Sequence, residues 1–209
     1  MTSDALRDPW TSLERQRESA VFGMWLFLGT EVLFFGATFA GYSVYRFLHP
    51  AAFLSAARAT NIYFGSINTF LLLTSSFVMA AGTLAAREGL FRFARICFPV
   101  TAGLGTLFLI LKGFEYSDDL DKHLVPGPGF PLPQSGAEIF WTFYWIMTLI
   151  HAAHLLIGIG AVLRLQIASR EDPEWLKDSP SAEVTALYWH FVDVIWVVLF
   201  PLLYLPGRS

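Results

Sequence analysis

The stretch ALYWHFVDVIWVVLFPLLYLP, residues 186–206, places His190 and Asp193 three residues apart in a run that is otherwise almost wholly apolar. A helix needs about 20 mostly apolar residues to cross a hydrocarbon core of roughly 30 Å, so this stretch is long enough to span a membrane. A charged group at the bilayer centre costs on the order of 2.5 to 3.5 kcal/mol. We therefore expect both side chains to face protein and not lipid.

The composition of the whole chain agrees with a membrane protein. Of the 209 residues, 55% are hydrophobic and only 15% are charged, which disfavours a soluble domain. The net charge of -3 and the scattered basic residues give no basic patch, so no nucleic-acid partner is expected. The single Cys97 excludes a disulfide framework or a thiolate cluster made by this chain alone.

Four further stretches are long and apolar enough to cross a membrane, which predicts an all-α polytopic protein with one transmembrane domain over residues 21–205. The polar residues 1–20 do not resemble a secretory signal and are expected to form a cytoplasmic tail. No fixed-period repeat is visible. The five spans are predicted at residues 21–46, 64–86, 94–114, 138–167 and 184–205.

The connecting segments carry helix-breaking and helix-capping signals. Residues 49–61 are expected to separate the first two spans, residues 87–91 to form a tight turn, and the Pro/Gly-rich residues 123–136 to form an extended connector. Ser135 with Glu138 predicts a capping box for the fourth span. At the start of the fifth, Ser179 and Pro180 predict the N-cap and the first helical position.

The distribution of Lys and Arg predicts the orientation. The N-terminal tail and the loops after the second and fourth spans hold nine basic residues, and the opposite side holds five. Basic residues are enriched on the cytoplasmic side of membrane proteins. The N-terminus is therefore predicted to be cytoplasmic and the C-terminus outside.

Ionisable residues inside or at the ends of the spans define the candidate site. They are Glu31 in the first span, Lys112 and Glu115 at the end of the third, His151 and His154 in the fourth, and His190 and Asp193 in the fifth. At 1.5 Å per residue, Glu31 and Asp193 both lie about 14 Å deep, with His154 within a turn or two of that level. We therefore expect a polar seam inside the bundle, in which histidines hydrogen-bond the acids.

The fifth span presents several of these residues on shared faces. His190 and Asp193 are separated by three positions, and Trp189, Asp193 and Trp196 follow the i, i+4, i+7 spacing of one helix face. For the histidines and for Asp193, a packing role through hydrogen bonds between helices is favoured over a functional one, and Asp193 is expected to pair with His190 or with a neighbouring helix. Haem ligation by His154 and His190 is conceivable, but no larger set of ligands accompanies them, so no metal or haem is expected on this chain.

The remaining polar groups suggest different roles. Glu31 has no partner within one helical turn, which favours a protonatable or lipid-contacting function. Lys112, near a span end, is expected to snorkel toward the interface. Glu115 is expected either to cap a helix or to bridge groups at the outer interface.

Small residues predict where helices approach closely. Gly29, Gly36 and Ala40 follow one face of the first span, and Gly158 lies one turn after His154 in the fourth. Such residues let helix backbones come together in membranes. These faces are expected to pack inside the bundle or against a partner.

Five stretches in sequence order resemble a known family, subunit III of the haem-copper oxidases, and most closely its cytochrome c oxidase members. They are GMWLFLGTEVLFFGATFAGY (23–42), INTFLLLTSS (67–76), LKGFEY (111–116), HAAHLLIGIG (151–160) and YWHFVDVIWVVLFPLLYL (188–205). GTEVLFFG and KHLVPGPGF favour the cytochrome c oxidase branch. Subunits of quinol oxidases and accessory subunits of nitric oxide reductases share much of this pattern and remain alternatives.

The resemblance implies a bundle of membrane helices without redox cofactors, in the bacterial inner membrane. It implies contact with subunit I, whose haem and copper reduce oxygen while protons move, with subunit II, with bound phospholipid, and with a small subunit IV as a further candidate. Longer family members have seven helices, and this chain starts where their third helix would, so it resembles the shorter five-helix bacterial form.

The resemblance also assigns residues. Glu31 matches the buried glutamate of the family, associated with the subunit I interface and with effective proton uptake. The other matches are Glu115 and Tyr116 to its Glu-Tyr pair, His151 and His154 to its HxxH spacing, and Trp189, His190 and Asp193 to its WHFVD signature. These positions are expected to shape structure and the proton environment, and none is expected to be catalytic.

Overall fold

The computed structural model describes residues 10, 12–133 and 136–208. These residues form seven helices and no strand, and five of the helices are long and apolar enough to cross a membrane, which confirms the all-α polytopic prediction. The five are α1 (Leu13–Leu48), α3 (Ile62–Arg87), α4 (Phe91–Asp121), α5 (Ala137–Glu171) and α7 (Ser181–Leu203). The two short helices are α2 (Pro50–Ala59) and α6 (Pro173–Asp178).

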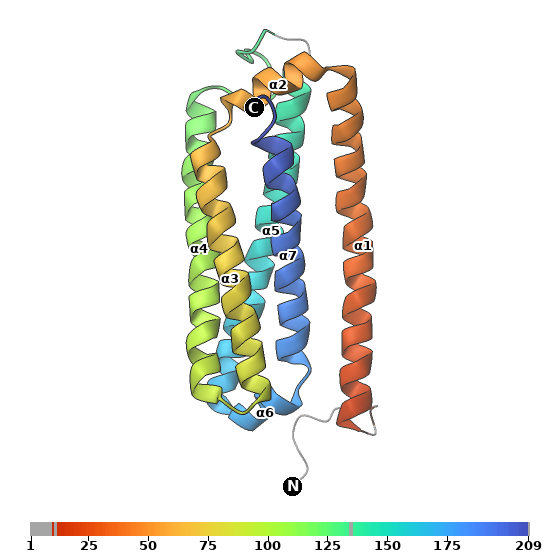
Figure 1. The fold of residues 1–209 in the computed structure, drawn as a ribbon, viewed down its shortest axis with the longest axis vertical. Coiled ribbons are helices and arrows are strands. Elements are labelled where there is room, and N and C mark those ends of the chain that lie inside the picture. Colours follow the sequence, from red (N-terminus) through yellow and green to blue (C-terminus); the bar gives the residue numbers. More distant parts are fainter. Residues whose placement is uncertain (1–9, 11, 134–135, 209) are drawn as a thin grey trace.

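The long helices run alternately up and down along one axis, and α3, α4, α5 and α7 form the packed body of the bundle (Figure 1). Helix α1 stands at the edge and packs on α5 and α7. Only Leu28, Phe35 and Tyr42 of α1 are buried, seven residues apart in sequence. Because seven residues make two turns, α1 meets the bundle through one narrow stripe.

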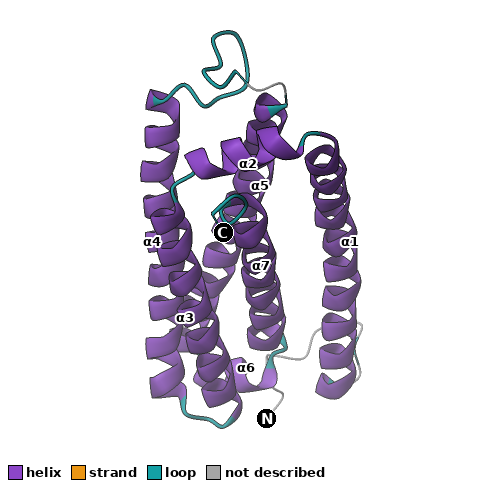
Figure 2. Ribbon diagram, turned by 45° about the horizontal axis from the view of Figure 1, so that its top comes forward, coloured by secondary structure: helices purple, strands orange, loops and turns teal. Residues whose placement is uncertain are grey.

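Helix α2 covers the end of the bundle where α1 ends and α3 begins (Figure 2). Pro50 opens it at a position where the missing N–H costs nothing. Its buried Phe53 packs edge-on against Tyr42, with ring centroids 5.2 Å apart. Near the C-terminus, Arg208 donates at 3.3 Å to Ala57 O, a carbonyl at the end of α2 that also accepts from the Thr60 N–H and hydroxyl. Residues 49–61 were expected only to separate the first two spans, so this helix corrects that prediction.

The turns between the long helices follow local sequence signals. Gly89, at φ +76°, ends α3 in the left-handed conformation, as a tight turn over residues 87–91 requires. Before α7, the Ser179 hydroxyl accepts the Ser181 N–H at 3.2 Å, but the helix begins at Ser181 with Pro180 as its N-cap, one residue later than predicted. Ser135 of the predicted capping box lies outside the described residues, and Gly136 precedes α5 at φ +101°.

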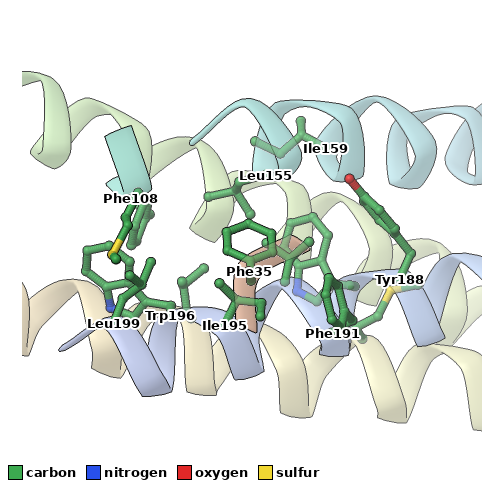
Figure 3. Close-up of a cluster of buried hydrophobic side chains, with 14 of the residues drawn as sticks. Phe35, Phe108, Leu155, Ile159, Tyr188, Phe191, Ile195, Trp196 and Leu199 are labelled. Carbon is green, nitrogen blue, oxygen red and sulfur yellow. The ribbon is translucent and has the colours of Figure 1, made fainter. Parts of the chain in front are cut away.

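Buried hydrophobic side chains from α1, α4, α5 and α7 fill the middle of the bundle (Figure 3). Phe108 of α4 meets Trp196 of α7 edge-on, with ring centroids 4.7 Å apart. Phe35 of α1 reaches the same core and packs edge-on against Phe191, 6.3 Å between centroids. A glycine, Gly105, lets α4 approach this core. The polar groups described next are held by this apolar packing.

Candidate functional site

Glu31 of α1 and His154 of α5 form a pair across the narrow α1 interface. The imidazole Nε2 lies 3.1 Å from Glu31 Oε2, and the side chains are 17% and 18% exposed, for His154 and Glu31 respectively. Glu31 lies one turn from both Leu28 and Phe35, the buried residues of the α1 stripe. The Phe35 ring packs edge-on against the imidazole, with centroids 5.3 Å apart. The stripe that attaches α1 therefore also turns Glu31 toward α5.

The second ring nitrogen of His154 fixes its tautomer. His154 Nδ1 lies 2.9 Å from the carbonyl oxygen of Ile150. A carbonyl can only accept, so Nδ1 carries a hydrogen. Nε2 then either accepts from the carboxylic acid of Glu31 or, in the protonated ring, donates to its carboxylate. Both forms hold one shared proton and no net charge, so the proton can move between the two side chains without changing the net charge in the apolar belt.

Tyr188 of α7 joins this pair from the third side. Its hydroxyl donates to the backbone oxygen of His154 at 3.0 Å, and Figure 3 shows it beside Phe191 in the aromatic core. The carbonyl of His154 lies on the α5 turn that carries the imidazole. The three helices α1, α5 and α7 thus meet at one polar point.

His190 and Asp193 of α7 do not pair with each other, so the prediction that His190 is the partner of Asp193 is wrong. His190 Nδ1 lies 2.7 Å from the hydroxyl of Ser76 on α3. Asp193 is 3% exposed and lies near Ser76, yet neither carboxyl oxygen reaches a hydrogen-bond partner among the described residues. The reason is geometric: α3 lies directly beside α7 and offers a hydroxyl at the level of His190.

The tryptophans that flank Asp193 tie α7 to α3. Trp189 donates its indole N–H to Ser75 and Trp196 donates to Thr69, both at 3.1 Å. Trp189, Asp193 and Trp196 all lie on the buried face of α7. The buried Asp193 therefore lies one helical turn from each of two hydrogen-bonded tryptophans.

His151 lies within the aromatic core. It is 1% exposed, and its ring lies 5.1 Å from Trp196 and 5.6 Å from Phe108 between centroids. Neither ring nitrogen has a hydrogen-bond partner among the residues that the structure describes. The polar seam expected from the sequence therefore forms as one direct imidazole–acid pair, with His151 apart from it.

A second polar cluster lies nearer the end of the bundle covered by α2, and Lys112 is its centre. Lys112 is 1% exposed, so the expectation that it snorkels to the interface is wrong. Its ammonium donates to Glu115 Oε2 at 2.9 Å, to Tyr144 at 3.0 Å and to Tyr204 at 2.6 Å. An ammonium has three N–H donors, and all three are used. The physical reason is that α4 continues to Asp121, so Lys112 lies well inside the helix.

The acceptors of this cluster are also satisfied. Tyr204 donates to Glu115 Oε1 at 2.9 Å, and Tyr144 donates to Asp119 at 2.8 Å. The ammonium further lies 4.6 Å from the centre of the Tyr144 ring and 5.4 Å from that of Tyr204. Glu115 is fully buried and therefore bridges groups inside the bundle, not at its surface.

Tyr116 lies at the edge of the same cluster. Its ring packs 4.7 Å from that of Trp145 and 4.9 Å from the Lys112 ammonium. Its hydroxyl has no hydrogen-bond partner within the part of the chain described. Tyr116 thus contributes an aromatic wall to the Lys112 cluster.

The small residues of α1 do not pack inside this chain. Gly29, Gly36 and Ala40 are exposed, and a Cβ at either glycine would meet open space within 4 Å. The expectation of an internal close approach is wrong because α1 uses its other face, the stripe of Leu28, Phe35 and Tyr42. A partner remains the alternative for the small face.

Gly158 of α5 does lie at a close helix contact. A Cβ there would be 3.2 Å from the ring of Trp189 and 3.4 Å from that of Tyr188. A larger side chain would therefore push α7 away from α5, next to the Glu31–His154 pair.

Two features of the polar side chains were not predicted from the sequence. One is the Lys112 cluster, for which the i, i+3, i+7 spacing of Lys112, Glu115 and Asp119 was a readable signal. The other is an ion-pair group in which Arg17 and Arg87 both contact Glu183 at 2.8 Å. It joins residues far apart in sequence, so no local pattern could predict it. Within residues 10, 12–133 and 136–208, no three His, Cys, Asp or Glu side chains gather as metal ligands would.

Together, the fold and these clusters define a multi-pass membrane bundle whose polar groups are turned toward neighbouring helices. A sequence model of the family described as cytochrome c oxidase subunit III matches residues 16–208, and the chain belongs to this family. It is accordingly a multi-pass bacterial membrane protein and a subunit III of the haem-copper oxidases, which are oxidoreductase complexes of several subunits.

Similar proteins carry two related names. The cytochrome c oxidase subunit 3 of Thermostichus vulcanus is 33% identical, with 90% of this chain and 88% of that protein covered. That of Synechocystis sp. is 32% identical, over 88% of this chain and 75% of the relative. The quinol oxidase subunit 3 of Bacillus spizizenii is 29% identical, over 93% of this chain and 92% of the relative. The type of electron donor is therefore not fixed by these similarities.

Proposed function

We propose that this chain is the non-redox subunit III of a proton-translocating cytochrome c oxidase of the bacterial inner membrane. The observation that carries the proposal is the family match along residues 16–208. In this role the chain contacts subunit I, which holds the haem and copper, together with subunit II and a small subunit IV. It supports assembly, binds phospholipid and assists proton uptake. Its N-terminus is cytoplasmic and its C-terminus outside, in line with nine basic residues against five.

A quinol oxidase is the second candidate, because a relative with that name covers 93% of this chain at 29% identity. The two candidates differ in the electron donor of the complex, not in this chain. The exposed small face of α1, with Gly29, Gly36 and Ala40, supports contact with a partner helix in either case.

Gentle purification through a tag on this chain tests the proposal. We expect a haem-containing complex to co-purify, and to oxidise reduced cytochrome c faster than a quinol. Faster quinol oxidation would assign the complex to the second candidate. Recovery of the chain as a lone monomer, with oxidase activity elsewhere in the membrane, would contradict both.

For Glu31 we propose a role in the proton environment of subunit I. The Glu31–His154 pair supports it, because it holds one proton that can lie on either partner at zero net charge. The 18% exposure of the Glu31 side chain leaves this proton within reach of a neighbouring subunit or lipid.

Replacing Glu31 tests this role. Glu31→Gln keeps a hydrogen bond to Nε2, since the amide can donate, but removes the exchangeable carboxyl proton. We expect normal recovery of the complex, with slower proton uptake or several-fold fewer turnovers before inactivation. Glu31→Lys puts an ammonium against His154 in the apolar belt, at a cost on the order of 2.5 to 3.5 kcal/mol, and should reduce assembly.

The matched control is Glu18→Gln, on an exposed position of the same helix. It should leave turnover, proton uptake and lifetime at wild-type values. If Glu31→Gln is also indistinguishable from wild type in all three measurements, the proposed role of Glu31 is wrong.

A further inference from the structure

A groove of about 220 Å³ runs between α3 and α7, near the end of the bundle where α1 begins. Its walls are apolar: Ala80 and Leu84 come from α3, and Ala186 and Leu187 come from α7. Thr83 also lines it, but its hydroxyl donates to a carbonyl of its own helix and offers no donor to a ligand. The two alanines are small, so the groove stays open between the larger leucines.

The end of this groove carries excess positive charge. Arg87 and Glu183 line it, and Glu183 Oε2 lies 2.8 Å from both Arg87 and Arg17. Two guanidinium groups on one carboxylate leave a net charge of plus one. Arg17 meets the carboxylate through both Nε and Nη2, whereas Arg87 meets it through Nη2. The Arg87 side chain is 44% exposed, and a guanidinium has five N–H donors, so it can bind a second anion.

The position of Arg87 fits the geometry of a lipid. Arg87 is the last residue of α3, where a spanning helix reaches the headgroup region. From there to Ala80, seven residues along α3, the groove extends about 10 Å toward the bilayer interior. Its inner end is bounded by His190, which bonds Ser76. A cationic end followed by an apolar channel matches a phosphate joined to an acyl chain.

We infer that the α3–α7 groove binds one anionic phospholipid, with its phosphate on Arg87 and an acyl chain between Leu84 and Leu187. The inference rests on the proposed function, because it assigns a site on this chain to the phospholipid that the proposed subunit III binds. The net positive charge of the Arg17–Glu183–Arg87 group is what favours an anionic lipid over a zwitterionic one.

The test uses the whole oxidase complex, purified in mild detergent and placed in nanodiscs of phosphatidylglycerol or phosphatidylcholine. The complex is then extracted from the nanodiscs with detergent, and the lipid that it retains is counted by native mass spectrometry. We expect one retained phosphatidylglycerol fewer per complex in Arg87→Gln than in wild type. We expect no such loss in the control Arg92→Gln, an exposed arginine of α4 outside the groove. Ala80→Phe fills the groove without changing charge and should cause the same loss as Arg87→Gln.

Three results would overturn the inference. The first is an equal number of retained lipids in Arg87→Gln and Arg92→Gln. The second is that Arg87→Gln loses as much lipid in phosphatidylcholine discs as in phosphatidylglycerol discs. The third is that a photo-crosslinker at Leu84 reacts with a protein subunit and not with lipid. Haem content, measured in the same preparation, separates the two proposals. A haem-containing complex without this lipid contradicts the site alone, whereas loss of the haem-containing partner from wild type contradicts the proposed function.

Discussion

Lys112→Ala is expected to destabilise the chain by about 3 to 5 kcal/mol, the range for removing one member of a buried ion pair. The substitution leaves Glu115 fully buried without its cation, while Tyr144 and Tyr204 each lose the ammonium that they accept from. The midpoint of unfolding by dodecyl sulfate in mixed micelles measures the change. Recovery of the chain with the oxidase complex should fall in parallel.

The control for Lys112→Ala is Lys122→Ala on the same helix. Lys122 also pairs with an acid, Asp118, but the two side chains are 50% and 41% exposed. Exposed ion pairs contribute about 0.2 to 1 kcal/mol, so this variant should unfold close to wild type. Equal effects of the two variants would show that burial of the Lys112 cluster has no energetic weight.

A double substitution separates the charge from the packing. Lys112→Met with Glu115→Gln removes both charges, keeps side chains of similar volume and preserves an acceptor for the Tyr204 hydroxyl. Buried ion pairs replaced by neutral groups of similar shape are often close to neutral in stability. The double variant should therefore be more stable than Lys112→Ala. If the double variant is instead far less stable than wild type, the ion pair itself contributes more to stability than its desolvation costs.

The five-span fold could be predicted because lipid leaves few alternatives to a long apolar helix. The same reasoning could not predict α2, because a helix of ten residues at the end of the bundle does not cross the membrane and depends only on local packing. Pro50 at its start and Arg58 in its last turn were the available signals. Lys112 was misassigned because the predicted end of the third span, residue 114, was seven residues short of the end of α4.

Contacts between helices were harder to predict than depth in the membrane. Counting residues brought Glu31 and His154 to similar levels, and the structure pairs them at 3.1 Å. Depth alone could not predict that Ser76 bonds His190 while Asp193 has no hydrogen-bond partner among the described residues. Which side chains meet at one depth depends on the rotation of α3 about its axis. Likewise, the small residues of α1 indicated a close contact, but the sequence did not state with which chain.

Gly105→Ala is expected to cost about 1 to 3 kcal/mol, the usual range for overpacking a well-packed core. A Cβ at this position would lie 2.8 Å from the Trp189 ring and 3.3 Å from Ile159. The indole cannot move aside freely, because Trp189 is fully buried and its N–H donates to Ser75. Either α4 or α7 must shift, and the unfolding midpoint in mixed micelles should drop accordingly.

Gly103→Ala, two residues earlier on α4, is the matched control, since a Cβ there meets nothing within 4 Å. The same change in a helix interior otherwise favours alanine by roughly 0.5 to 1 kcal/mol, so this variant should equal or exceed wild type in stability. The two alanines are thus expected to act in opposite directions on one helix. A stabilising Gly105→Ala would mean that α4 and α7 do not approach as closely as the structure places them.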